Sequence, residues 1–130
     1  FRPLANRKTI VLSRNHQYAK DLAEEVHRIR RRREIPIPTI QVVAADSMAA
    51  ALEIAHKHGR PTFVCGGQEL YRQALEDPNC TDIFATAVHG DYDCDRFVPP
   101  YYHLFTHRLD LYATCEHGVK YRIAHWGRAK

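Results

Sequence analysis

Short apolar runs suited to buried strands alternate with helical patterns along most of this sequence. The apolar runs cover residues 10–12, 40–44, 61–65 and 82–88. The connections between them, at 19–33, 47–58 and 68–75, carry the spacing of helices. This strand–helix alternation is typical of an α/β chain in which crossover helices link parallel strands.

Prolines, helix-capping residues and glycines separate the helical segments from the strands. Pro36 and Pro38 end the first helix, because proline cannot continue a helical hydrogen-bond ladder. Asp46 or Ser47 can cap the second helix, and Gly59 stops it. The end of the chain has a different pattern: residues 104–114 and 119–126 alternate, with a turn glycine at Gly118 between them. The expected fold is therefore one α/β domain over residues 1–130, with a mixed, mainly parallel sheet, flanking helices and a C-terminal antiparallel hairpin.

Charge and cysteine content narrow the functional classes. The 130 residues carry a net charge of +4, concentrated in Arg28 and in residues 30–33. Such a run is typical of a solvated helix end, which we favour here, or of a site for phosphate or nucleic acid. The four cysteines are widely spaced and the nine histidines are scattered, so we expect free thiols and no metal site. No apolar run suits a membrane span, and no secretory leader is evident, so the expected location is intracellular, cytoplasmic or mitochondrial.

A glycine pair gives the strongest local signal. The apolar run at 61–65 meets Gly66-Gly67, and a helical pattern starts at the next residue. Glycines let backbone N–H groups approach a ligand, and a helix N-terminus adds donors and partial positive charge, which suits phosphate or pyrophosphate. A tight turn without a ligand is the alternative, and spacing alone slightly favours it, because two glycines form neither the dinucleotide fingerprint nor a P-loop.

Three polar residues occupy informative places in the strand pattern. Arg14 lies just past the carboxyl end of its strand, where open α/β sheets bind ligands. Arg7 lies at the opposite end and could hold a carboxylate in a bidentate pair. Thr86 places a hydroxyl among apolar neighbours and therefore needs a hydrogen-bond partner. Taken singly, Arg7 and Arg14 would more often be exposed surface residues. Thr86 taken singly would more often bond the backbone.

Taken in order, these motifs resemble those of dihydrofolate reductase. The resemblance rests on Arg-Pro-Leu at 2–4, on Arg7 to Arg14, on Val-Cys-Gly-Gly-Gln-Glu-Leu-Tyr at 64–71 and on Ile-Phe-Ala-Thr at 83–86. Asp-Arg-Phe-Val-Pro at 95–99 and Gly-Val-Lys-Tyr-Arg at 118–122 extend it to nearly the whole chain.

The resemblance implies a set of NADPH contacts. Leu12, Ser13 and Arg14 would lie along the adenosine, with the last two at its 2′-phosphate. Gly66 and Gly67 would be joined by a cis peptide and flank the pyrophosphate. The helix after them would continue the contact through Gln68, Glu69, Leu70 and Tyr71, with Tyr71 near the nicotinamide.

The resemblance also implies contacts to dihydrofolate. Arg7 would pair with the α-carboxylate of its glutamate tail, and Leu4 would line the benzoyl region, with Arg2 in the same substrate-binding group. The carbonyl of Cys65 would face the pterin amino group, and Thr86 would support the pterin through a hydrogen bond.

Several family features have no counterpart in this sequence. The first strand, the mobile active-site loop and the first helix, which holds the acidic residue of the family's site, would precede Phe1. We therefore assign no catalytic residue and expect the chain alone to be inactive, and also unstable or oligomeric. The missing region would come from the same polypeptide or from a partner chain. Residues 15–38 form an Arg-rich helical insertion, and Asp46 stands where the family has a basic or neutral residue near the 2′-phosphate.

Two functions follow from these expectations. The first, which we favour, is NADPH-dependent reduction of 7,8-dihydrofolate to tetrahydrofolate, completed by the absent N-terminal region. The alternative is a non-catalytic structural subunit built on the reductase fold within a larger, RNA-containing assembly, which residues 28–33 would suit. A nucleic-acid partner, bound through residues 28–33, is possible but is not favoured.

Overall fold

The computed structural model describes residues 6–32 and 40–130. The chain forms two compact units, residues 1–63 and 64–130, and each is considered by itself. Arg2 and Leu4, which were expected in the folate site, lie outside the described residues.

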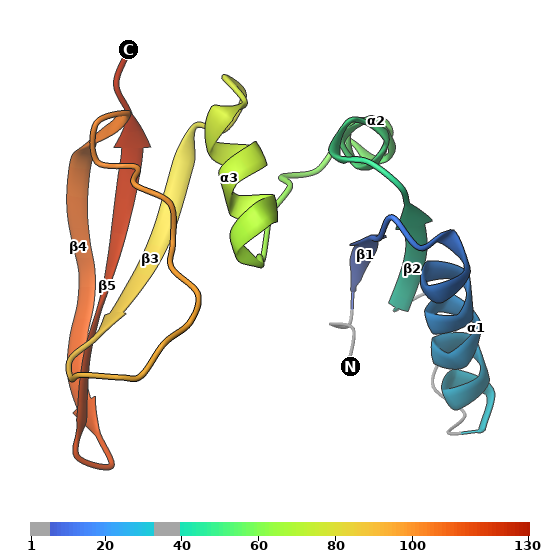
Figure 1. Ribbon diagram of the computed structural model, residues 1–130, viewed down its shortest axis with the longest axis horizontal. Coiled ribbons are helices and arrows are strands. Elements are labelled where there is room, and N and C mark those ends of the chain that lie inside the picture. Colours follow the sequence, from blue (N-terminus) through green and yellow to red (C-terminus); the bar gives the residue numbers. More distant parts are fainter. Residues whose placement is uncertain (1–5, 33–39) are drawn as a thin grey trace. The chain divides into compact units, whose positions relative to one another are not determined.

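The first unit is a parallel strand–helix–strand followed by a second helix (Figure 1). Its elements are β1 (Arg7–Leu12), α1 (His16–Arg32), β2 (Ile40–Ala45) and α2 (Met48–His58). The two strands pair in parallel from Arg7↔Ile40 to Leu12↔Ala45, and α1 makes the crossover and lies beside β2. Within the described part of the chain, no helix is long and apolar enough to cross a bilayer.

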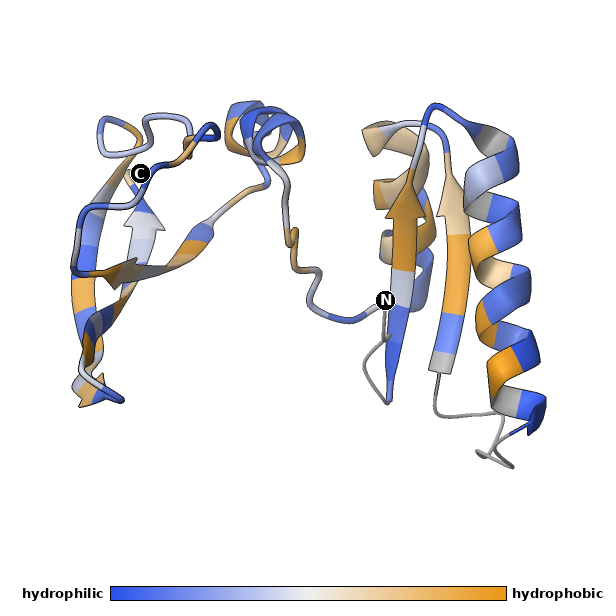
Figure 2. Ribbon diagram, turned by 60° about the horizontal axis from the view of Figure 1, so that its bottom comes forward, coloured by the Kyte–Doolittle hydropathy of each residue, from blue (hydrophilic) through white to orange (hydrophobic). Residues whose placement is uncertain are grey.

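Apolar faces of α1, β2 and α2 form the core of the first unit. Val26 of α1, Val42 and Ala45 of β2, and Ala51 and Ala55 of α2 are buried, and apolar residues run along both strands in Figure 2. The expected apolar stripe on α1 is therefore confirmed at its centre. Towards the end of the helix the stripe is open, since Ile29 is 42% exposed.

The boundaries of α2 follow from its capping residues. The Ser47 hydroxyl accepts a hydrogen bond from the Ala50 amide at 3.2 Å, which satisfies one of the free donors of the first turn. Gly59 ends the helix in the left-handed region, with φ of 66°. Both expectations from the sequence are confirmed.

The second unit is a helix followed by an antiparallel sheet (Figure 1). Its elements are α3 (Gln68–Glu76), β3 (Asp82–Val88), β4 (Phe105–Glu116) and β5 (Val119–Arg128), and the strand order is β3-β5-β4. β4 and β5 form the expected hairpin. Its two-residue loop, His117-Gly118, has positive φ at both positions, as a tight hairpin turn with the strand twist requires.

The two faces of this sheet differ in burial. On one face Phe105 is fully buried and Ala124 is nearly so, and the rings of Tyr101 and Tyr102 pack edge-on against Trp126. Residues directly opposite in an antiparallel ladder share a face, so the other face carries Phe84 and Leu109, both paired with His125. These two side chains are 57% and 59% exposed, so this second face, the open face, is uncovered in the described chain.

Arg128 connects the end of α3 to the covered face of the sheet. Its guanidinium donates to the carbonyls of Cys80 at 2.6 Å and of Leu75 and Asp77, both at 2.9 Å. The same group lies 4.7 Å from the ring centre of Phe105. One half-buried side chain therefore bonds three backbone carbonyls around the helix C-terminus. Of these, the Asp77 carbonyl also accepts from the Cys80 amide at 3.0 Å in the turn that follows the helix.

The mixed α/β class is confirmed, but the described strands form two separate ladders. Only β1 and β2 are parallel, whereas β3 pairs antiparallel with β5. The run at 61–65, which the sequence predicts as a strand, is not one. A strand needs a neighbour to receive its backbone hydrogen bonds, and no other described segment pairs with these residues.

Candidate functional site

Gly66 is a glycine for reasons internal to the second unit. Its φ is +91°, which side-chain-bearing residues rarely adopt, and an added Cβ would lie 3.1 Å from the Tyr71 ring. The peptide bond to Gly67 is cis, as the resemblance implies. The structure thus brings Gly66 and Tyr71 together across the first turn of α3.

Gly67 has no such internal reason. Its φ is −79°, which any residue can adopt, and an added Cβ would meet nothing within 4 Å. It occupies the N-cap of α3 without any side-chain cap, so the first-turn amides keep room for an anion in front of them. The space over Gly67 is what a ligand approaching the backbone closely would need.

The polar side chains of the first turn of α3 have hydrogen-bond partners of their own. Gln68 accepts a hydrogen bond from the Phe97 amide at 3.4 Å, which ties the segment between β3 and β4 to the helix. Glu69 accepts two hydrogen bonds from Arg72, at 3.1 and 2.7 Å. These bonds raise the pKa of Arg72, with a further contribution from Glu76. Because Glu69 is paired, its charge opposes an anion at the helix N-terminus less than a lone carboxylate would.

The remaining predicted residues of the second unit differ in exposure. Leu70 and Tyr71 are half-buried, and Cys65 is exposed next to Gly66. Thr86 lies opposite Ile123 on the open face and is exposed. The sequence suggested a backbone partner for its hydroxyl; among the described residues it has none, so it can bond a ligand or water.

In the first unit the predicted cofactor residues lie at the carboxyl end of β1. Leu12 is half-buried in the strand, and the Ser13 amide donates to the Ala45 carbonyl at 3.0 Å, which joins the ends of β1 and β2. The Ser13 hydroxyl accepts from the Asn15 amide at 3.1 Å. Arg14 is exposed. Arg7 is exposed at the opposite, amino end of β1, as expected from the sequence.

A small cavity of about 270 Å³ opens beside Ser13. It lies where the parallel strands end, the usual ligand position in open α/β sheets. Its lining is Ser13, Lys20, Ala44, Ala45, Asp46, Ala50 and Ile54. Arg14 does not line it. Lys20 was not predicted from the sequence, although an exposed cation on the first turns of the crossover helix is the signal that could have identified it.

The predicted site residues are therefore divided between the units. Arg7, Leu12, Ser13 and Arg14 belong to the first, and Cys65, Thr86 and the residues from Gly66 to Tyr71 belong to the second.

Comparison with known protein families decides what these motifs belong to. The dihydrofolate reductase family model matches residues 29–126. The chain belongs to the dihydrofolate reductase family. The resemblance and the α/β class expected from the sequence are thereby confirmed.

Several dihydrofolate reductases and bifunctional relatives are similar to this family member. A bifunctional dihydrofolate reductase-thymidylate synthase from Glycine max is 27% identical over all of the chain and 23% of its own length. The dihydrofolate reductases of Heliothis virescens and Pneumocystis carinii are 29% and 31% identical over 76% of the chain. The match covers 46% and 43% of those proteins, so the chain spans less than half the length of these relatives.

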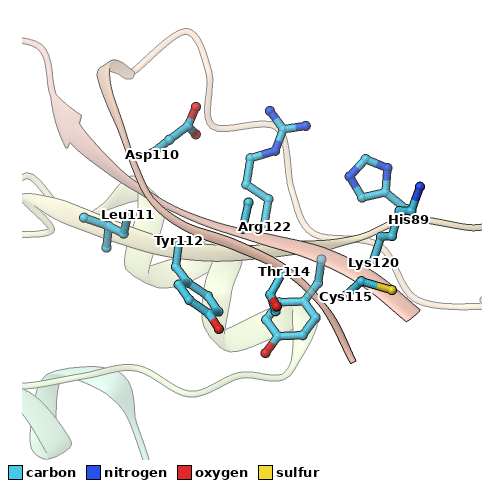
Figure 3. Close-up of a pocket in the computed structure, with 10 residues that line it drawn as sticks. His89, Asp110, Leu111, Tyr112, Thr114, Cys115, Lys120 and Arg122 are labelled. Atoms are coloured by element: carbon cyan, nitrogen blue, oxygen red, sulfur yellow. The ribbon is translucent and has the colours of Figure 1, made fainter. Parts of the chain in front are cut away.

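A larger hollow of this reductase-family chain is lined by none of the predicted site residues. It measures about 690 Å³ and lies along the β4–β5 hairpin. Figure 3 shows Asp110, Arg122 and His89 on one side of the strands and Tyr112 and Thr114 on the other. A hollow lined from both faces of a two-stranded ribbon follows the twist of the hairpin and does not enclose a ligand, so we give more weight to the smaller cavity.

The open face also holds a polar pair that the sequence did not reveal. His125 Nε2 lies 2.6 Å from Asp82 Oδ1, across the β3–β5 ladder, and its ring centre is 5.0 Å from that of Phe84. Hydrogen bonds from Thr81 and from His125 lower the pKa of Asp82. In the described part of the chain no three His, Cys, Asp or Glu side chains group as metal ligands. None of the four cysteines forms a disulfide among the described residues, as the sequence suggested.

Proposed function

We propose that this chain forms the cofactor- and folate-binding portion of a dihydrofolate reductase that transfers hydride from NADPH to 7,8-dihydrofolate, giving tetrahydrofolate. The observation that carries the proposal is the unfilled space over Gly67 at the N-terminus of α3. A bare glycine N-cap with exposed first-turn donors is suited to a pyrophosphate. Family membership supports NADPH as the ligand that brings one.

The proposal assigns ligand-binding roles within each unit by itself. In the first, Ser13 and Arg14 take the 2′-phosphate end of the cofactor, and Arg7 at the other end of β1 takes the folate carboxylate. In the second, Gly66 and Gly67 flank the pyrophosphate and Tyr71 approaches the nicotinamide. Thr86 presents a solvent-facing hydroxyl to the pterin. NADPH supplies the hydride, and these residues bind and orient the two reactants.

Reduction also needs a proton donor beside the pterin. Neither of the two residues assigned to the pterin is a carboxylic acid, since they are Cys65 and Thr86. We therefore propose that a region N-terminal to this sequence, in the same polypeptide or in a partner chain, supplies the acid and completes the active enzyme. The chain alone binds ligands without useful turnover.

A structural role in an RNA-containing assembly has its own supporting observation. Arg28, Arg31 and Arg32 are exposed on the last turns of α1, and among the described residues none of them forms an ion pair. Three unpaired cations exceed the half-charge of a helix C-terminus, so the dipole alone does not account for them. The reductase proposal remains the stronger because it also accounts for Gly67.

A pair of glycine substitutions tests the reductase proposal. In the full chain, NADPH binding is followed by energy transfer from Trp126, the only tryptophan. Gly67→Ala fills the proposed pyrophosphate space and should weaken binding about tenfold or more, equivalent to about 1.4 kcal/mol. Gly127→Ala is the matched control, since its Cβ would make only an ordinary 3.5 Å contact with His107. It should change the dissociation constant less than about twofold.

Circular dichroism of both variants should match the wild type. If Gly67→Ala binds NADPH as the wild type does, the pyrophosphate assignment is wrong. A chain that binds single-stranded RNA but no NADPH would favour the structural role.

A further inference from the structure

The small cavity of the first unit combines opposite charges at one place. Lys20 reaches it from α1 and Asp46 from the end of β2, and Ser13 contributes a hydroxyl from the end of β1. Both charged residues are exposed at the surface, whereas Ser13 is half-buried. A group with a hydroxyl or a phosphate would therefore meet an acceptor, a cation and a hydroxyl together.

The position of Asp46 in the topology has a known physical consequence. β1, α1 and β2 form a parallel crossover unit, and Asp46 is the first residue after its second strand. In dinucleotide-binding α/β units, an acidic residue at this place accepts a hydrogen bond from the ribose 2′-hydroxyl, while a 2′-phosphate calls for a cation there. The Ser13–Ala45 hydrogen bond keeps Asp46 within one residue of the joined strand ends.

The local bonding of Asp46 is compatible with that role. The Ser47 hydroxyl donates to Asp46 Oδ1 at 3.1 Å. An ionised carboxylate offers about four acceptor positions on its two oxygens, so it can accept from several donors at once, including a ribose hydroxyl. At neutral pH a phosphate carries negative charge and offers mainly hydrogen-bond acceptors, so the same carboxylate repels it.

Resting on the proposed function, we propose that Lys20 and Asp46 jointly set the cofactor preference, so that this chain accepts NADH as well as NADPH. Lys20 attracts the 2′-phosphate of NADPH, and Asp46 opposes it and instead accepts from the 2′-hydroxyl of NADH. Because both side chains are solvent-exposed, water and salt screen each effect, and each should be on the order of tenfold and no larger.

Two reciprocal substitutions test this assignment. Dissociation constants for NADH and NADPH are measured by titration of the full chain, with Asp46→Asn and Lys20→Gln beside the wild type. The wild type should prefer NADPH by less than about tenfold. Asp46→Asn should tighten NADPH about tenfold and weaken NADH, while Lys20→Gln should weaken NADPH about tenfold and leave NADH within about twofold. Glu53→Gln, which removes an exposed carboxylate of α2 that pairs with Lys57 outside the cavity, is the control and should change neither.

The possible results separate this inference from the proposed function. A wild-type preference for NADPH above about a hundredfold overturns the inference while upholding NADPH binding. Equal changes for both cofactors in either variant also overturn it, because the 2′ position is the only difference between them. If neither cofactor binds, the proposed function fails, and the inference fails with it.

Discussion

Replacement of Arg128 by methionine should destabilise the second unit more than any other single charge removal on its covered face. The guanidinium makes three hydrogen bonds to carbonyls around the end of α3 and lies over the ring of the fully buried Phe105. Methionine keeps the length and apolar stem of the side chain, so the substitution isolates the polar contacts and the charge.

The magnitude follows from those contacts. Hydrogen bonds to a charged donor contribute about 1.5–3 kcal/mol each when buried. Because Arg128 is half-buried and one nitrogen serves two of the carbonyls, the lower figure is appropriate and the second shared bond counts for little. Two such bonds with about 0.5–1 kcal/mol from the Phe105 contact give about 3.5–4 kcal/mol. With a urea m-value near 1 kcal/mol/M for a unit of this size, that is a shift of about 3.5–4 M in midpoint, or unfolding without urea.

Trp126 provides the assay, because its ring packs against Tyr101 and Tyr102 on the covered face. Urea unfolding of wild type, Arg128→Met and Arg108→Met is followed by its fluorescence at low protein concentration. Arg108 is the matched control. It lies 5.4 Å from the Trp126 ring centre, and its ion pair is with the exposed Asp110, so its loss should cost less than about 1 kcal/mol. Equal costs for the two variants would refute the role given to Arg128.

Two further predictions concern the open face. The exposed Phe84 and Leu109 should make the chain self-associate at micromolar concentration, as measured by sedimentation velocity. Phe84→Lys should reduce this self-association. The control Val98→Lys, which alters an exposed loop residue, should leave it unchanged. Association unaffected by Phe84→Lys would place the contact elsewhere. The lowered pKa of Asp82 means that its contribution to stability is complete above its ordinary value of 3.8 and is lost as the pH falls through the folded-state value. Acid unfolding of Asp82→Asn should therefore lack that part of the pH dependence, and identical acid transitions in variant and wild type would show that the Thr81 and His125 bonds contribute nothing.

Local signals in the sequence predicted local structure well. Ser47 and Gly59 set the ends of α2, and Gly118 marks the hairpin turn, because caps and turns depend on a few neighbouring residues. The strand expected at 61–65 was wrong for the described chain, since apolar character specifies burial but cannot supply the neighbouring strand that makes a ladder.

In the candidate site too, local motifs could be predicted from the sequence, whereas contacts between distant segments could not. Motif order was enough to single out Gly66, Gly67 and Tyr71. The structure supplies the reason for Gly66, because a Cβ added there would lie 3.1 Å from the Tyr71 ring. The His125–Asp82 pair could not be found from spacing, because it joins residues far apart in the sequence that the fold brings to one strand ladder. Lys20 had a local signal, as a cation early in the crossover helix, but its place at a cavity depends on β2 and α2 as well.

The most direct test of the central claim is a map of NADPH binding by backbone amide NMR shifts in the full chain. The proposed function predicts large changes at Gly66, Gly67 and the first turn of α3, together with changes at Ser13 and Arg14. Changes confined to the β4–β5 hairpin, or none at saturating NADPH, would contradict it.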